Sequence, residues 1–167
     1  MTVVSVVKDA EAMTLTVTAR FDAPIGRVWR VWSDPRRLER WWGPPTYPAT
    51  VTEHDLAAGG TVAYVMVGPE ADRHRGWWRV RAADPPHALE FESGFADADG
   101  TPSRDGATAM VRVALSEPAG GGTQMEITTT WSSLEAMEQM LATGMEDGMA
   151  DAVGQIDELL GRRPLGR

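Results

Sequence analysis

The chain has 167 residues, with a hydrophobic share of 43% and a charged share of 24%, which is typical of a single folded domain over residues 1–167. It contains no cysteine, so disulfides, thiolate nucleophiles and cysteine-ligated metals are excluded. The net charge of −8 argues against nucleic acid or an anionic membrane surface as the main partner. No signal-peptide pattern and no bilayer-spanning apolar run is evident, so we expect a cytoplasmic protein without membrane insertion.

A strand, two short helices and a series of strands are predicted in chain order. Apolar and polar residues alternate over residues 14–20, which indicates a half-buried strand. The first helix is expected to carry Pro24 in its first turn, and the second to be capped by Asp34 with Pro35 in its first turn. Strands are then predicted at 50–55, 60–67, 75–83, 87–95, 107–115 and 123–131, joined as an antiparallel meander.

The last segment has the pattern of a long helix. Ser132 and Glu135 are spaced as a capping box, and apolar residues recur every three or four positions as far as Leu159. We expect a break near Thr143 and Gly144 that divides the segment into two helical pieces. The predicted fold is α+β, a curved antiparallel sheet of about seven strands around a long C-terminal helix, with two short helices after the first strand.

This order of elements resembles the helix-grip superfamily, also called START-like, Bet v 1-like or SRPBCC. Within it, the chain is similar to the bacterial branch related to the C-terminal domain of the activator of Hsp90 ATPase. The resemblance is carried, in chain order, by Ala23-Pro24, Val28-Trp29, Trp32-Ser33-Asp34-Pro35, Arg40-Trp41-Trp42-Gly43-Pro44, Asp55-Leu56-Ala57-Ala58-Gly59-Gly60, Gly76, Asp84-Pro85-Pro86, Gly121-Gly122-Thr123 and the stretch from Gly144 to Leu160. Similar proteins commonly place an arginine where this chain has Ala57, so a polar role for that arginine is not carried over.

The resemblance implies a hydrophobic cavity between sheet and helix, of the kind that holds lipids, polyketides or other apolar molecules. Side-chain alternation along the strands and the helical period predict its wall. The expected lining residues are Trp41, Tyr64, Met66, Trp78, Phe91, Val111, Val113, Ile127, Trp131, Met137, Met140, Leu141, Met145 and Met149. Methionine is flexible and polarizable, so such a wall adapts to varied ligands, but the same residues also suit a solid core.

Three tryptophans carry further expectations. Of Trp41 and Trp42, one is expected to pack in the core and the other to gate the cavity mouth. Trp77 alternates away from Trp78 and is expected to be partly exposed, which hints at a homodimer. The acidic stretch between Leu134 and Leu160 has two interpretations, a solvated helix face or a face that docks on a basic partner or a second copy of the chain.

Patterns for catalysis or metal binding are sparse. The three histidines, His54, His74 and His87, are far apart in the sequence, so neither a metal site nor a cofactor is expected. No phosphate-binding glycine motif occurs. The weak catalytic candidates are His54 as a general base and Tyr64 as a proton donor, against the alternative of an ordinary polar strand end at His54.

Three functions follow from these observations. Binding of a small hydrophobic ligand, lipid-like or polyketide-like, is favoured because few polar side chains are predicted to face inward. A polyketide cyclase or aromatase is the first alternative, and it needs at least two polar groups that converge in the cavity. A chaperone cofactor of the Hsp90 type, acting through its surface, is the second alternative. The fold hosts all three, so it does not choose between them.

Overall fold

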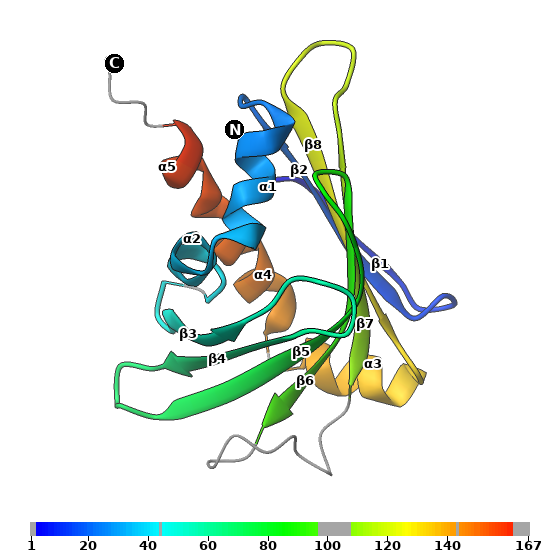
Figure 1. Ribbon diagram of the computed structural model, residues 1–167. Coiled ribbons are helices and arrows are strands. Elements are labelled where there is room, and N and C mark those ends of the chain that lie inside the picture. The colour runs from blue at the N-terminus through cyan, green and yellow to red at the C-terminus, as the bar shows by residue number, and fades with distance from the viewer. Residues whose placement is uncertain (1–2, 44, 97–107, 143, 162–167) are drawn as a thin grey trace.

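The computed structural model describes residues 3–43, 45–96, 108–142 and 144–161. These residues form one antiparallel sheet and a set of helices that lies on its concave side (Figure 1). The strands are β1 (Val3–Asp9), β2 (Thr14–Phe21), β3 (Ala49–His54), β4 (Thr61–Val67), β5 (Arg73–Asp84), β6 (Ala88–Ala96), β7 (Ala109–Ser116) and β8 (Thr123–Trp131). The helices are α1 (Ile25–Ser33), α2 (Pro35–Trp41), α3 (Leu134–Leu141), α4 (Met145–Gly154) and α5 (Ile156–Gly161).

The predicted α+β helix-grip fold is confirmed, with one strand more than expected. The sheet order is β1-β2-β8-β7-β6-β5-β4-β3, so β3 to β8 form the predicted meander and β2 closes on β8. Each predicted strand lies within two residues of its expected bounds, although residue 107 and the loop at 97–106 lie outside the described residues. The additional strand, β1, pairs with β2 at the edge of the sheet, so the two short helices follow the second strand.

Strict alternation in β2 and β8 builds the centre of the sheet. Leu15, Val17 and Ala19 are at most 1% exposed, while the threonines between them are half-buried or exposed on the other face. Val17 lies opposite Ile127 of β8 across the ladder, and both face the helices. Buried side chains at alternate positions therefore fix which face of the sheet the helices cover.

The two short helices begin as their proline signals suggest, with one correction. Asp34 caps α2, because its Oδ1 accepts a hydrogen bond from the Arg36 amide at 2.9 Å, and Pro35 occupies the first turn. Pro24, in contrast, is the residue before α1 and not part of its first turn. Its φ of −68° suits either position, and its carbonyl accepts the amide of Val28 at 3.2 Å.

The C-terminal segment is helical but broken twice. The predicted capping box is wrong by one residue, because Ser133 has the extended backbone of a cap and its Oγ accepts the Ala136 amide at 3.0 Å. The predicted break is found between α3 and α4, where Gly144 has a φ of +87°, although Thr143 lies outside the described residues. A second break at Gln155 was not predicted and separates α4 from α5, which gives three pieces instead of two.

An aromatic core joins α1 and α2 to the sheet. Trp32, Trp41 and Trp78 are 0% exposed, and the ring of Trp78 stacks on Phe91 with centroids 4.0 Å apart. The indole N–H of Trp32 donates to Sδ of Met125 at 3.4 Å. Helices α4 and α5 extend this core along the sheet, and α3 packs beyond them against β8.

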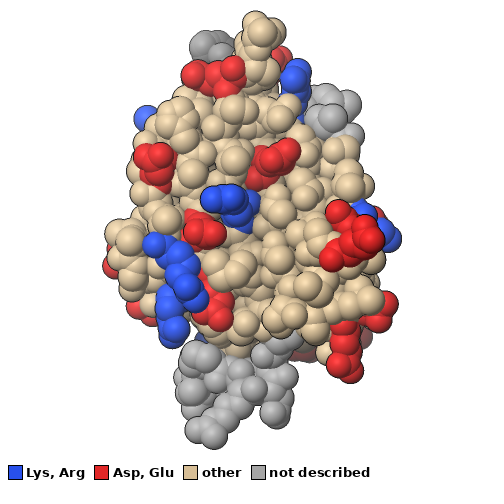
Figure 2. All heavy atoms as spheres, turned by 90° about the vertical axis from the view of Figure 1, so that its right-hand side faces the viewer, with Lys and Arg blue, Asp and Glu red and all other residues tan. Residues whose placement is uncertain are grey.

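The face of the molecule on the side of β1, β7 and β8 does not gather charge of one sign (Figure 2). On the side of the molecule where β1, β7 and β8 lie, basic and acidic side chains are interspersed among neutral ones (Figure 2). Such a face lacks the basic stripe that tracks a nucleic-acid backbone. In the part of the chain that the structure describes, no helix is long and apolar enough to cross a membrane.

Candidate ligand-binding cavity

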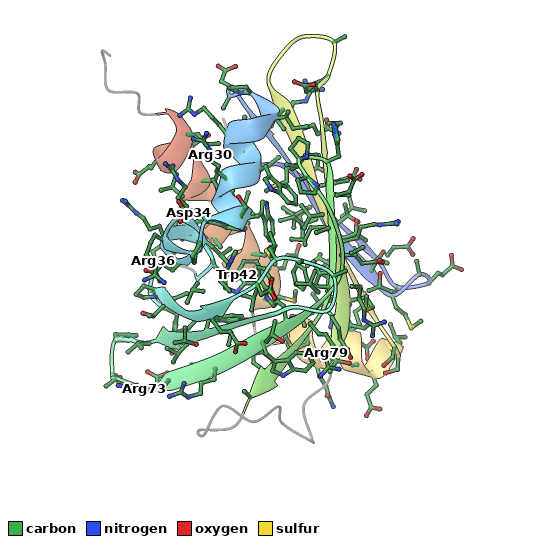
Figure 3. All side chains as sticks on the ribbon, viewed as in Figure 1. Arg30, Asp34, Arg36, Trp42, Arg73 and Arg79 are labelled. Carbon is green, nitrogen blue, oxygen red and sulfur yellow. The ribbon has the colours of Figure 1, made fainter. Side chains whose placement is uncertain are left out.

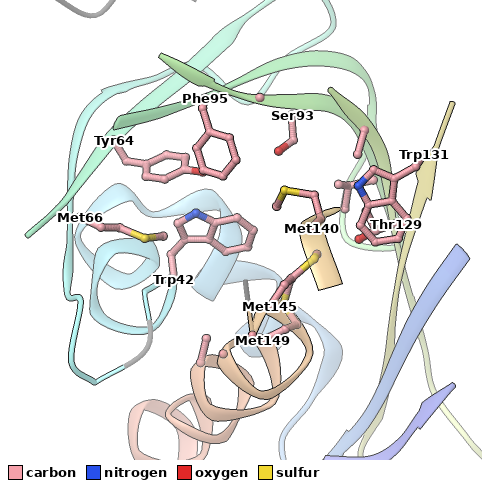
Figure 4. Close-up of a pocket in the computed structure, with 16 residues that line it drawn as sticks. Trp42, Tyr64, Met66, Ser93, Phe95, Thr129, Trp131, Met140, Met145 and Met149 are labelled. Atoms are coloured by element: carbon pink, nitrogen blue, oxygen red, sulfur yellow. The ribbon is translucent and has the colours of Figure 1, made fainter. Parts of the chain in front are cut away.

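A cavity of about 290 Å³ lies between the concave face of the sheet and helices α3 and α4 (Figure 4). Its walls come from the end of α2, from β4, β6, β7 and β8, and from the segment that runs from α3 through α4. The described residues that line it are Trp42, Tyr64, Met66, Ser93, Gly94, Phe95, Ala109, Val111, Thr129, Trp131, Met140, Gly144, Met145, Gly148, Met149 and Ala152.

The expected lining residues divide into two groups in the structure. Seven of them line the cavity, namely Tyr64, Met66, Val111, Trp131, Met140, Met145 and Met149. The others lie behind this wall. Trp41, Trp78, Phe91, Val113 and Ile127 are at most 1% exposed in the main core, and Met137 and Leu141 pack in a second cluster with Leu15 and Trp131. The sequence could not separate the two groups, because alternation along a strand predicts which face a side chain lies on but not how far it lies from the cavity.

Small residues on one face of α4 leave the space that forms the cavity. Gly148 and Ala152 share this face with Met145 and Met149, at spacings of three and four residues. A Cβ added at Gly148 would meet no atom within 4 Å. The sequence signal that was missed is therefore the small residues on the face of α4 that carries Met145 and Met149. Small residues there indicate a helix whose side chains do not fill the space against the sheet.

The two adjacent tryptophans have different surroundings. Trp41 is 0% exposed and its indole N–H donates to the carbonyl oxygen of Val31 at 2.8 Å, so it is a core residue. Trp42 instead points into the interior between α4 and the sheet and forms part of the cavity wall, whereas Arg36 and Arg79 point outward (Figure 3). Trp41 and Trp42 have different surroundings because they are adjacent at the end of α2, and residues one apart on a helix face different directions.

The hydroxyl of Tyr64 provides a polar point in this apolar wall. Tyr64 is 8% exposed, and burial raises the pKa of its phenol above the ordinary value. The indole N–H groups of Trp42 and Trp78 lower that pKa in part. Both N–H groups are buried, and neither has a hydrogen-bond partner of ordinary length and angle among the described residues.

The described residues of the wall carry no charge at neutral pH. Ser93 and Thr129 contribute hydroxyl groups from β6 and β8, and Thr129 is 3% exposed. Tyr64 is the one titratable side chain among the described lining residues. An ionised ligand would be buried here without a counter-charge, which is costly, so the cavity suits a neutral molecule.

The two weak catalytic candidates are not brought together. Nε2 of His54 lies 3.0 Å from the carbonyl oxygen of Trp32, and His54 does not line the cavity that holds Tyr64. His74 lies on the surface with its Nε2 3.0 Å from Oδ2 of Asp72, and His87 is at the turn between β5 and β6. Among the described residues, no group of three or more histidine or carboxylate side chains is placed to hold a metal ion.

Trp77 is half-buried on the outer face of the sheet, as its alternation with Trp78 predicts. Its indole N–H donates to the carbonyl oxygen of Phe95 at 2.9 Å, and the guanidinium carbon of Arg79 lies 5.7 Å from its ring centroid. These contacts within one chain account for the position of Trp77 without a second copy.

Comparison with known proteins gives a consistent result. Residues 22–161 match the family described as activator of Hsp90 ATPase homolog 1-like protein. A crystal structure of a Mycobacterium smegmatis protein shares 42% identity and a TM-score of 0.88, covering 96% of this chain and 98% of that one. A solution structure of an Arthrobacter aurescens protein shares 46% identity and a TM-score of 0.90, with coverages of 96% and 93%.

More distant structures share the fold. A Staphylococcus epidermidis protein has 23% identity and a TM-score of 0.82, covering 95% of this chain and 94% of that one. No curated protein is significantly similar to the chain.

Proposed function

We propose that this chain, which belongs to the activator of Hsp90 ATPase homolog 1-like family, binds a small and largely apolar molecule between its sheet and helix α4. The observation that carries the proposal is the cavity of about 290 Å³, whose described lining side chains are apolar apart from three hydroxyl groups. An apolar cavity of about 150 Å³ is enough to hold benzene. A molecule of roughly twice that size, such as a bicyclic compound or a short branched chain, is therefore the expected ligand class.

The nature of the wall supports binding. Met66, Met140, Met145 and Met149 approach the space from β4, α3 and α4. Unbranched thioether side chains repack at low cost, so the same wall accommodates ligands of different outline. Pockets that bind small molecules combine such an apolar lining with a few polar groups that fix orientation, and Tyr64 provides one here.

The cyclase alternative needs a second proton-transfer group beside Tyr64. His54 was the candidate, but its Nε2 is placed against the carbonyl oxygen of Trp32, and it is not a lining residue. Ser93 and Thr129 carry hydroxyl groups that act as bases only when a neighbouring group takes their proton, and no described lining residue is of that type. The arrangement therefore favours a binder over an acid–base catalyst.

The methionine methyl groups offer a direct test of binding. The chain has nine methionines, of which Met66, Met140, Met145 and Met149 line the cavity. Titration of the 13C-methyl-methionine-labelled protein with indane, a neutral bicyclic hydrocarbon, is expected to shift these four signals in a saturable way. Met125 lies in the core and receives the Trp32 indole N–H, so its signal serves as the internal control. Uniform or unsaturable shifts would contradict a defined site.

Filling the cavity provides the complementary test. Gly148→Leu adds a four-carbon side chain where a Cβ meets no atom within 4 Å, so it is expected to abolish the indane-induced shifts. Because leucine is the better helix former, the thermal unfolding midpoint is expected to be kept or raised. Gly154→Leu, at an exposed position of the same helix, is the matched control and should bind indane as before.

The same pair of variants addresses the surface-acting alternative. A chaperone cofactor that works through its exterior would keep its activity when the cavity is filled, so stimulation of an Hsp90-type ATPase that survives Gly148→Leu would favour that role. Unchanged indane binding by Gly148→Leu would show that the ligand lies elsewhere and would contradict the proposal.

A further inference from the structure

The hydroxyl of Tyr64 restricts what the cavity can bind. Its side chain is 8% exposed and lines the space, with the hydroxyl near Phe95 and above the ring of Trp42 (Figure 4). No described residue accepts a hydrogen bond from this hydroxyl. A hydrogen-bond donor that faces an apolar space without an acceptor is unfavourable, so its proton is available for a molecule in the cavity.

The groups around the phenol of Tyr64 determine its role. The rings of Trp42 and Trp78 pack edge-on against that of Tyr64, with centroids 5.9 Å and 6.4 Å away, and an indole nitrogen can only donate. Both indole N–H groups are buried and have no hydrogen-bond partner among the described residues. A phenolic oxygen has two lone pairs and one proton, and an indole N–H can interact only with the lone pairs. Tyr64 is thereby left to act toward the ligand as a donor and not as an acceptor.

We propose that Tyr64 donates its phenolic hydrogen to an oxygen of the bound molecule, and that this molecule is a neutral carbonyl compound of about bicyclic size. The inference rests on the proposed binding function and adds the chemical class of the ligand. A neutral carbonyl accepts a hydrogen bond and brings no charge into a wall whose described residues have none. A carboxylate would be stripped of water without a cation beside it, because no lysine or arginine is among the described lining residues.

The ionisation state of Tyr64 supports its role as a hydrogen-bond donor. Burial raises the pKa of Tyr64, so its phenol keeps its proton across the neutral range. Gly76 lies opposite Tyr64 in the ladder between β4 and β5, and a Cβ at that position would collide with the phenol. The absence of a side chain at position 76 therefore leaves the space that the Tyr64 ring occupies.

The test compares two probes of matched shape, the ketone 1-indanone and the hydrocarbon indane. Replacement of Tyr64 by phenylalanine keeps the ring and removes the donor. We expect Tyr64→Phe to weaken the binding of 1-indanone by about tenfold and to leave the affinity for indane within about twofold. Tyr47→Phe, which removes the hydroxyl of the one other tyrosine, a residue that does not line the cavity, is the control and should change neither affinity by more than about twofold.

A measurement on the unaltered protein removes any dependence on the folding of the variant. The infrared carbonyl stretch of bound 1-indanone, labelled with 13C at the carbonyl, should lie at lower frequency than in hexane, because a hydrogen bond from Tyr64 weakens the C=O bond. A stretch at the hexane frequency would overturn the proposal, as would equal loss of both probes in Tyr64→Phe. A shift that persists in Tyr64→Phe but disappears in Thr129→Val would assign the donor to Thr129 instead and would also overturn it.

The outcomes separate the two proposals. If neither probe binds the unaltered protein, the binding function itself fails and this inference fails with it. If indane binds and the ketone shows no dependence on Tyr64, the cavity is a binding site but the carbonyl class is wrong.

Discussion

Tyr64 on β4 and Gly76 on β5 lie opposite each other in the sheet, and the tyrosine ring occupies the space that a side chain at position 76 would need. The glycine therefore sets the position of the one titratable group among the described residues of the cavity wall. The pairing links a local feature of the ladder to the chemistry of the site, and it can be tested by adding a single methyl group.

Gly76→Ala is expected to lower the free energy of unfolding by about 1–3 kcal/mol, because the added Cβ collides with the Tyr64 phenol in a packed region. Urea denaturation followed by tryptophan fluorescence measures the change. Gly26→Ala is the control, since Gly26 is exposed on α1 and a Cβ there meets no atom within 4 Å. Equal effects of the two substitutions would show that the space beside Tyr64 is not restricted.

Two glycines of the C-terminal segment should respond to alanine with opposite signs. Gly144 has a φ of +87°, so Gly144→Ala is expected to destabilise the fold by about 1–2 kcal/mol through backbone strain alone. Gly148 lies within α4 in ordinary helical geometry, so Gly148→Ala is expected to stabilise by up to about 1 kcal/mol. Thermal unfolding of both variants beside the original chain gives the comparison. Stabilisation by both would mean that position 144 is helical in solution.

The start of α3 can be located by two serine substitutions. Ser133→Ala removes the oxygen that accepts the Ala136 amide and is expected to cost about 1 kcal/mol. Ser132→Ala leaves this cap intact and is expected to have an effect within about 0.5 kcal/mol. Chemical denaturation measures both, and the reverse order of effects would restore Ser132 as the cap.

The ionisation of Tyr64 predicts a dependence of stability on alkaline pH. Burial raises its pKa in the folded chain, so the folded state holds the phenolic proton to a higher pH than the unfolded state does. The unfolded state then ionises first, and the free energy of unfolding falls as the pH rises from the ordinary tyrosine value toward the raised one. Below the ordinary value this contribution is fully present.

Tyrosinate absorbance provides the measurement, because the chain has only two tyrosines. In Tyr47→Phe the remaining phenol is Tyr64, and its titration midpoint is expected above that of a free tyrosine. The loss of stability at alkaline pH should be smaller in Tyr64→Phe than in the original chain. An ordinary midpoint for Tyr64 would indicate that the phenol is open to water.

Much of the fold could be predicted because its signals are local. The alternation in β2 and the proline signals around Asp34 depend on neighbours in the sequence, and these predictions are confirmed. Strand β1 was missed because it is an edge strand with weak alternation, in which Val7 is 55% exposed and the half-buried Val6 precedes it. An edge strand that packs on one neighbour only needs less patterning than a central one.

The cavity wall was harder to predict than the fold. Which of Trp41 and Trp42 reaches the cavity depends on where α2 ends against the sheet, and no local pattern contains that distance. Likewise, Gly148 contributes to the cavity because it has no side chain, and this effect can be recognised only once the position of the opposite wall is known. Trp78 and Phe91 have the correct face but stack behind the wall.

The hydrogen bonds of the Gln155 side chain have a consequence for the order in which the chain folds. Its amide nitrogen donates to the carbonyl oxygens of Trp41 at 3.3 Å and Gly43 at 2.7 Å, which flank Trp42 at the end of α2. These partners lie more than a hundred positions earlier in the chain. The wall that carries Trp42 is thus secured only when the last helices dock, and a chain still emerging from the ribosome exposes the bare concave sheet until then. The cavity is thus among the last features to form, and its completion covers the concave apolar face of the sheet.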